Sequence, residues 1–137
     1  MNRDGGFMSH FTKVRTQLVD EGCLRASLSD AGYVVPAGRT RIGGWLGSDE
    51  EVDVGVPDVV DGYGIGFTWE QSGSYAAVAD WSELKHRGIR QGEFVGRVSH
   101  LYGVQATLRT MEPQGFVVAE RTSQADGSVR IVMRRVA

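Results

Sequence analysis

Cysteine is nearly absent from this sequence of 137 residues, because Cys23 is the only one. A single cysteine excludes a disulfide within the chain and any site built from several thiolates, such as a zinc finger or an iron–sulfur centre. The three histidines, His10, His86 and His100, lack the H-x-x-x-H spacing that places two imidazoles on one helix face. We therefore expect no metal and no cofactor, and we expect Cys23 to serve helix packing.

Long apolar runs are also missing. No run approaches the roughly 18 to 20 residues that cross a bilayer, and the opening stretch MNRDGGFMSHF has no apolar signal core. We therefore expect no membrane partner and a cytoplasmic location. Hydrophobic residues at 41% and charged residues at 23% are typical of one ordinary globular domain.

A clustered basic surface is absent as well. The formal net charge is −2, with six basic and ten acidic residues in 1–68 and nine basic and seven acidic residues in 69–137. Neither half has the strongly positive footprint that nucleic-acid binding usually requires. We therefore expect no nucleic acid as a partner.

The first half of the chain alternates between strand and helix signals. Alternation over 11–18 predicts a half-buried strand, and Asp20 is a suitable N-cap for an amphipathic helix over 21–31 that ends at Gly32. Extended structure resumes at 33–35 and continues over 39–47 as a glycine-softened strand. Valines alternating with acidic residues in 48–58 predict one exposed edge strand that ends at Pro57.

The second half predicts two hairpins separated by a long helix. In 62–69 the glycines fall on one face of a strand and the bulky residues Tyr63, Ile65, Phe67 and Trp69 on the other, and a return strand covers 74–81. Apolar residues recurring every three or four positions from Phe94 to Met111 predict the helix. The two strands of the second hairpin flank Asp126-Gly127. The predicted fold class is α+β, a mostly antiparallel sheet with two helices packed on it.

A short internal similarity indicates either a duplicated structural unit or a coincidence. The first helix exits through Gly32-Tyr33-Val34-Val35 and the second through Gly115-Phe116-Val117-Val118. This pattern is consistent with a duplicated strand–helix–strand unit. It is equally consistent with coincidence, because glycine caps and strand-forming residues commonly follow helices.

Several of these segments together resemble the hypothetical chloroplast reading frame thirty-five family, a domain of unknown function. The matching pieces are Met8-Ser9-His10-Phe11, the stretch GSYAAVADW, the helix end YGVQATLRTMEPQGF and the terminus DGSVRIVMRR. The resemblance implies an N-terminal extension over 1–7 and a single domain over 8–137. It carries no established reaction. Relatives encoded near an AAA-type ATPase imply an accessory role with that ATPase as a partner.

The candidate ligand-binding residues are drawn from the glycine-rich strand and its surroundings. A bare strand face allows a helix or a ligand to approach closely, and we expect a helix there rather than a ligand groove. The walls of such a groove would be Trp69, Tyr75, Asp80 and Trp81, and His10 is a further candidate.

Two of these candidates have a competing structural interpretation. Asp80 is a candidate general acid or base, but no second carboxylate or nucleophile lies at a diagnostic spacing. The favoured interpretation is a carboxylate that caps backbone amides at the strand end. For His10 we favour a hydrogen bond or cap at the start of the first strand, because no partner for chemistry is evident.

Two charged clusters remain. The acidic residues between Asp49 and Asp61 could dock a basic partner or a cation, although a solvated strand edge is the simpler interpretation. The basic residues Lys85, His86, Arg87 and Arg90 could hold an anion, but their place on a predicted linker favours a role in solubility.

Two hypotheses follow for the function. The first is a non-catalytic adaptor that binds another protein. The second is a small enzyme or ligand-binding module with a pocket near Tyr75, Asp80 and Trp81. A homo-oligomer, formed through the acidic edge or the C-terminal strand, is a third possibility that the sequence does not weigh.

Overall fold

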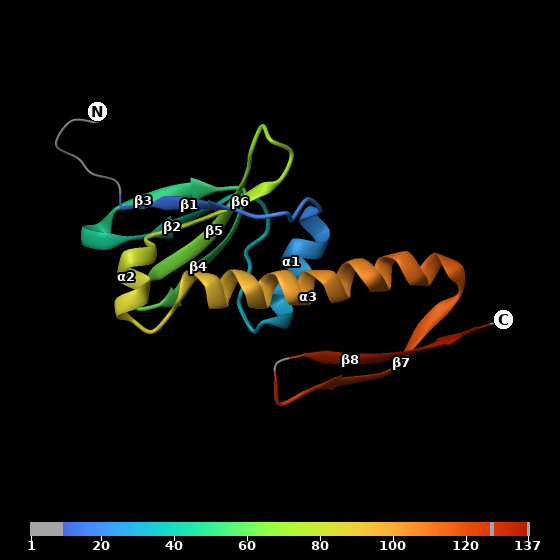
Figure 1. Cartoon of the computed structure of the whole chain (residues 1–137). Coiled ribbons are helices and arrows are strands. Elements are labelled where there is room, and N and C mark those ends of the chain that lie inside the picture. Colours follow the sequence, from blue (N-terminus) through green and yellow to red (C-terminus); the bar gives the residue numbers. More distant parts are fainter. Residues whose placement is uncertain (1–9, 127, 137) are drawn as a thin grey trace.

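The computed structural model describes residues 10–126 and 128–136 and shows an α+β fold (Figure 1). The predicted extension over 1–7 and residues Met8 and Ser9 lie outside the described residues. The elements in chain order are β1 (Thr12–Arg15), α1 (Glu21–Asp30), β2 (Thr40–Gly43), the 3-10 turn η1 (Trp45–Gly47), β3 (Asp49–Val52), β4 (Val54–Val60), β5 (Tyr63–Trp69), β6 (Tyr75–Ala79), α2 (Trp81–His86), α3 (Gln91–Met111), the 3-10 turn η2 (Glu112–Gln114), β7 (Phe116–Ser123) and β8 (Val129–Arg135).

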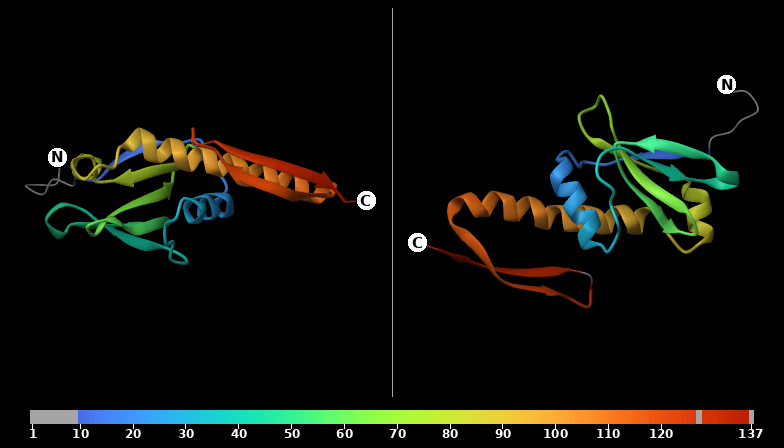
Figure 2. Two further views of the ribbon diagram at one scale, coloured as in Figure 1. Left: turned by 90° about the horizontal axis from the view of Figure 1, so that it is seen from below. Right: turned by 180° about the vertical axis from the view of Figure 1, so that it is seen from behind.

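The central layer is a four-stranded antiparallel sheet with the order β1-β6-β5-β4. Its β5–β6 hairpin confirms the prediction for residues 62–81. The bulky face of β5 packs against α1 and α3, so that Ile65 and Phe67 share one core cluster with Leu24, Leu28 and Phe94. Helix α3 extends well beyond the sheet, and the β7–β8 hairpin folds back along it (Figures 1 and 2).

The glycine face of the sheet is covered by the β2–β3 sheet, not by a helix. Gly55 of β4 lies directly opposite Gly66 of β5. A Cβ added at Gly66 would lie 2.5 Å from Cγ1 of Val52, and one added at Gly64 would lie 2.8 Å from Cβ of Ile42. The expectation that a helix packs on this face is therefore wrong, because the β2–β3 hairpin folds over the bare backbone first. The same side chains occupy the space predicted for a ligand groove.

The prediction of one exposed strand over 48–58 is also wrong. This stretch forms β3 and β4 with a break at Asp53, and Val52, Val54 and Val56 are all buried. Pro57 does not end the strand but lies within β4, where the register with β5 shifts between Val56 and Val60. Proline is tolerated there because β4 is the edge strand of its sheet.

The first predicted helix is confirmed with its cap. Asp20 accepts a hydrogen bond from the Cys23 backbone at 2.8 Å, and Cys23 itself is buried. Gly32 and Gly115 both adopt positive φ, so the two helix exits share their glycine geometry. Residues 33–35, however, form no strand. The similarity therefore does not extend to a duplicated strand–helix–strand unit.

Helix α2 was missed, because its residues were assigned to the end of a strand and to a linker. Asp80 caps this six-residue helix, and Lys85 and His86 lie in its last turn. Arg87 is not a free linker cation, because it contacts Glu83 at 2.9 Å and lies over the Tyr63 ring. The long helix and the C-terminal hairpin are confirmed as α3 and β7–β8.

We expect Gly66→Ala to lower the free energy of unfolding by about 2 kcal/mol, because the added methyl meets Val52. Gly96→Ala is the matched control: no atom of another described residue packs within 4 Å of its Cβ position, so better helix propensity should raise stability by up to about 1 kcal/mol. Urea denaturation measures both. Because the added methyl meets Val52, Val52→Ala should restore part of the stability that Gly66→Ala loses. Strictly additive stability losses in the double variant would contradict this contact.

Candidate functional site

The most unusual surface feature is the turn between β2 and β3, formed by Trp45, Leu46 and Gly47 and called here the WLG tip. Trp45 is 40% exposed and Leu46 is 80% exposed, so two large apolar side chains stand in solvent next to each other. Isolated exposed apolar residues are common on protein surfaces, but an adjacent tryptophan and leucine on a protruding turn suit contact with another protein.

The WLG tip is held from below by Asp80. This side chain is 1% exposed, and its Oδ2 accepts a hydrogen bond from the Trp45 backbone N–H at 3.0 Å. Its Oδ1 accepts from the Glu83 backbone N–H at 3.3 Å and thereby caps α2. One buried carboxylate therefore joins the tip to α2, as the capping interpretation of Asp80 predicted.

The N-terminal segment supports the tip from the side. The His10 ring lies 4.7 Å from the Trp45 ring, at an interplanar angle of 58°. Phe11 packs so closely that a Cβ on Gly44 would lie 2.7 Å from its Cζ atom. Ser48 closes the turn by donating its hydroxyl to the Trp45 carbonyl at 2.8 Å. His10 thus has a structural contact, although it is an aromatic one rather than the predicted hydrogen bond.

Backbone strain is concentrated beside the tip. Within residues 10–126 and 128–136, the non-glycine residues with positive φ are Leu46 (54°) and Asp61 (52°). Both line the same surface depression of about 500 Å³, together with Arg41 and Tyr63. Aspartate tolerates this conformation, but leucine in it costs roughly 1 to 2 kcal/mol. Strain of this kind is typical of functional sites, where the surrounding structure enforces it.

The five predicted site residues are not brought together into one pocket. Trp69 and Tyr75 pack edge to face, with ring centroids 5.1 Å apart, at the start of β6. Asp80 lies beyond the other end of this strand, roughly 16 Å away along it. Trp81 faces the helices, where it belongs to the main core and donates its Nε1–H to the Thr12 carbonyl. Asp80 and His10 are the two that share a neighbour, because both contact Trp45 of the WLG tip, Asp80 at its backbone amide and His10 at its ring.

Trp45 and Leu46 themselves were missed by the sequence interpretation, which placed both in a strand over 39–47. The available signal was the glycine pair Gly43-Gly44 before them and Gly47 after them, because flanking glycines indicate a turn. No sequence signal could indicate the partner Asp80, which lies 35 residues further along the chain.

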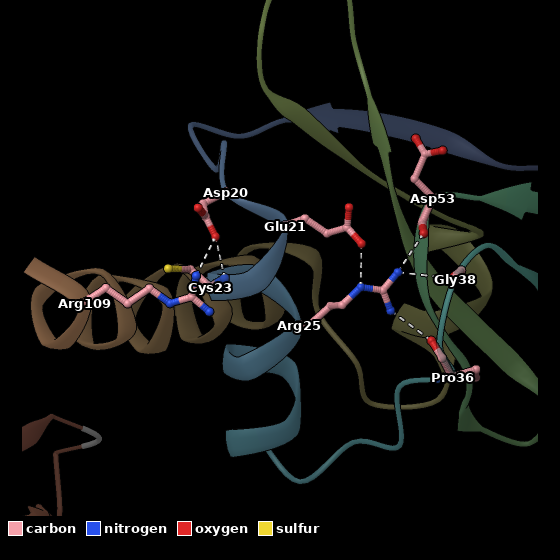
Figure 3. A network of polar contacts seen from close by, with 8 residues as sticks. All are labelled: Asp20, Glu21, Cys23, Arg25, Pro36, Gly38, Asp53 and Arg109. Atoms are coloured by element: carbon pink, nitrogen blue, oxygen red, sulfur yellow. Dashed lines mark hydrogen bonds and ion pairs between the residues drawn. The ribbon is translucent and has the colours of Figure 1, made fainter.

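A second polar network lies at the opposite end of the β6 strand and fixes α1 (Figure 3). Arg25 reaches from α1 to the carbonyls of Pro36, Gly38 and Asp53, and it also pairs with Glu21. These contacts occupy the guanidinium with structural partners and leave it no evident chemical role.

Hydrogen bonds, nearby charges and burial shift the pKa values of three side chains in this part of the molecule. The Cys23 backbone hydrogen bond lowers the pKa of Asp20, and Arg109 at 3.4 Å lowers it further. Burial raises the pKa of the Cys23 thiol, and the nearby Asp20 adds to this. Burial also raises the pKa of Tyr75. A thiol and a phenol with raised pKa values remain protonated near neutral pH, so neither is an activated nucleophile.

Neither a metal-binding cluster nor a membrane-spanning helix is found among residues 10–126 and 128–136. No group of three or more His, Cys, Asp or Glu side chains is arranged to hold a metal ion within them. In the same part of the chain, no helix combines the length and apolar character needed to cross a membrane.

Comparison with known proteins identifies relatives without known function. A family model described as "Protein of unknown function (DUF1257)" matches residues 27–132. The "Uncharacterized protein ycf35" of Pyropia yezoensis is 29% identical over 128 residues, which are 93% of this chain and 98% of that protein. Its namesake in Cyanophora paradoxa is 27% identical with the same coverage. No solved structure matches the chain significantly.

Asp80→Ala should lower the free energy of unfolding by at least about 2 kcal/mol, because it leaves the Trp45 N–H without its partner and removes the cap of α2. Asp58→Ala is the matched control, since Asp58 also accepts from a backbone amide, that of Gly62, but at an exposed turn. Denaturant titration compares the two. Equal losses would show that Asp80 does not couple the tip to α2.

The charge of Asp20 should stabilise the protein only above acidic pH. Its folded pKa lies below its unfolded value, so its contribution is present above the unfolded pKa and is lost as pH falls through the folded pKa. Asp20→Asn keeps a good N-cap without the charge. The stability difference between wild type and this variant should therefore shrink from about pH 6 to about pH 2.5 in urea denaturation. A difference independent of pH would contradict the assignment.

Proposed function

The chain belongs to the DUF1257 family of proteins of unknown function, and we propose that it is a non-catalytic accessory protein that binds another protein through the WLG tip. The observation that carries the proposal is the exposure of Trp45 and Leu46 on a turn that buried Asp80 holds in place. Tryptophan is the residue most typical of interface hot spots, where an apolar anchor enters a pocket of the partner.

The rigidity of the tip favours this role. The Trp45 amide, the Trp45 carbonyl and the Trp45 ring each have a fixed partner, in Asp80, Ser48 and His10 respectively. An anchor that is already ordered loses less conformational entropy on binding than a flexible one. The partner should therefore present an apolar pocket large enough for an indole ring and a leucine side chain.

The strained and exposed position of Leu46 also favours a binding role for the tip. Leu46 is both strained and 80% exposed, so it contributes little to the stability of the isolated chain. Asparagine or glycine would fit the positive φ of this position better. A leucine here is understandable if the exposed side chain is used in binding.

An AAA-type ATPase is the first partner to test, because the sequence resemblance implies an accessory role beside such an enzyme. The competing proposal of an enzyme or ligand-binding module is less favoured. Asp80 has both carboxylate oxygens engaged by backbone amides, and Ile42 and Val52 fill the space over the glycine face.

The test compares Trp45→Ala/Leu46→Asn with Val34→Ala, which removes a valine that is 81% exposed elsewhere. Binding to the purified AAA-type ATPase from the same host is measured by calorimetry. We expect the tip variant to bind at least about 30-fold more weakly, because it removes two anchors, and Val34→Ala to bind normally.

Stability separates this effect from misfolding. Leu46→Asn alone should leave the unfolding free energy unchanged or raise it by up to about 1 kcal/mol, since asparagine tolerates positive φ. Reduced binding by a variant of equal or higher stability supports the proposal. Binding of the ATPase by Trp45→Ala/Leu46→Asn with the affinity of the wild type would overturn it.

A further inference from the structure

The C-terminal part of the chain is incompletely buried. We call residues 109–126 and 128–136 the C-terminal arm, which comprises the end of α3, η2 and the β7–β8 hairpin. None of these residues is buried, and Val117, Val118 and Val136 are between 40% and 52% exposed. An isolated two-stranded hairpin is only marginally stable in water. The arm is attached to the body along α3 and through two ion pairs, Arg121–Asp30 at 3.1 Å and Arg109–Asp20 at 3.4 Å.

The arm also has free strand edges. Among the described residues, β7 pairs only with β8 and β8 only with β7. An open edge can accept a strand of another chain. On β8 the alternation of side chains places Arg130, Val132 and Arg134 on one face. This face therefore combines an apolar side chain with two cations.

The charges of the arm and of the rest of the molecule are opposite. The arm carries five arginines and three carboxylates, a net charge of +2, whereas residues 10–108 carry nine basic and thirteen acidic residues, a net charge of −4. Arg134 takes part in none of the ion pairs found among the described residues, and Arg130 reaches only Glu120, at 3.5 Å. Two arm cations are thus available for an acidic surface.

The β3 strand offers such a surface. Among the described residues it pairs only with β2, so its outer edge is free. Asp49 and Glu51 alternate onto its exposed face. Their partners within the chain are Arg41 at 2.7 Å and Arg39 at 3.5 Å, and all four side chains are more than half exposed. Ion pairs this exposed contribute little to stability, so they can be exchanged.

The arm cannot reach this edge within one molecule. Both β3 and β2 lie at the end of the body that is remote from the arm in all three views (Figures 1 and 2). We propose that the β8 edge of the arm docks along the β3 edge of a second copy of this chain, with Arg130 and Arg134 facing Asp49 and Glu51. A twofold axis makes the exchange reciprocal and closes the assembly as a dimer.

This proposal goes beyond the proposed function, because it uses a surface other than the WLG tip. The test is sedimentation velocity of the full chain over a range of concentrations. We compare Arg130→Glu/Arg134→Glu on the arm with Asp49→Lys/Glu51→Lys on the β3 edge. Arg15→Glu/Arg90→Glu on the exposed surface of the body has the same charge change as the arm variant and is its matched control.

We expect a wild-type dimer that weakens at high salt. Each charge-reversed variant should raise the dimer dissociation constant at least about 10-fold, because like charges then face each other across the interface. An equimolar mixture of the two variants should restore a heterodimer, since arm and edge carry opposite charges at both of its contacts: the acidic arm of one variant faces the basic edge of the other, and the basic arm faces the acidic edge. The control should dimerise like the wild type.

Several outcomes would overturn the proposal: a wild-type chain that stays monomeric at about 200 µM, well above a micromolar dissociation constant, reversed variants that dimerise normally, or a mixture without rescue. Should Asp49→Lys/Glu51→Lys fail to fold, Asp49→Asn/Glu51→Gln removes the charges without repulsion and should still weaken the dimer. Binding of an acidic protein to the arm of a monomeric chain would instead identify a different occupant and overturn the proposal.

The proposed function and the proposed dimer can be tested separately. Trp45→Ala/Leu46→Asn should dimerise normally, so loss of partner binding at the tip is distinguishable from loss of dimerisation through the arm.

Discussion

Close contact between two sheets over a strip of bare backbone is the constraint on which the rest of the structure depends. Gly55, Gly64 and Gly66 leave a strip of bare backbone on one face of β4 and β5, and Ile42 and Val52 fill the space above it. With Val78 they form a second small core beside the main one. Because the β2–β3 hairpin is fixed in this way, the turn at its end always lies above the end of β6, where Asp80 can reach it.

Asp80 fixes the conformation of the WLG tip at the end of this packed hairpin. A buried carboxylate is stable only if its oxygens are engaged, and here the two oxygens accept from the amides of Trp45 and Glu83. The same contact therefore begins α2 and orders the WLG tip. His10 and Phe11 add contacts from the N-terminal segment, so two regions distant in sequence from the tip, this segment and Asp80, support one exposed pair of apolar side chains.

The WLG tip and the C-terminal arm lie at different ends of the molecule and have different chemistry, whereas the β3 edge that the arm of a second copy would contact follows the tip directly in the chain. The WLG tip is apolar and rigid, whereas the arm is cationic and offers strand edges. A dimer formed through the arm would carry two tips. If the partner is itself oligomeric, two linked tips would bind it with an avidity above that of either tip alone.

The sequence alone determined the elements whose signals are local: α1 with its Asp20 cap, α3 and the two hairpins, each specified by periodicity, a capping residue or a glycine turn. It also indicated that Asp80 caps backbone amides. Tertiary structure alone decided what covers the glycine face, why Val52 and Val54 are buried in separate strands, and that Trp45 rather than Tyr75 lies next to Asp80. These features depend on which strands pack together, and contacts between residues 35 positions apart leave no periodic signal along the chain.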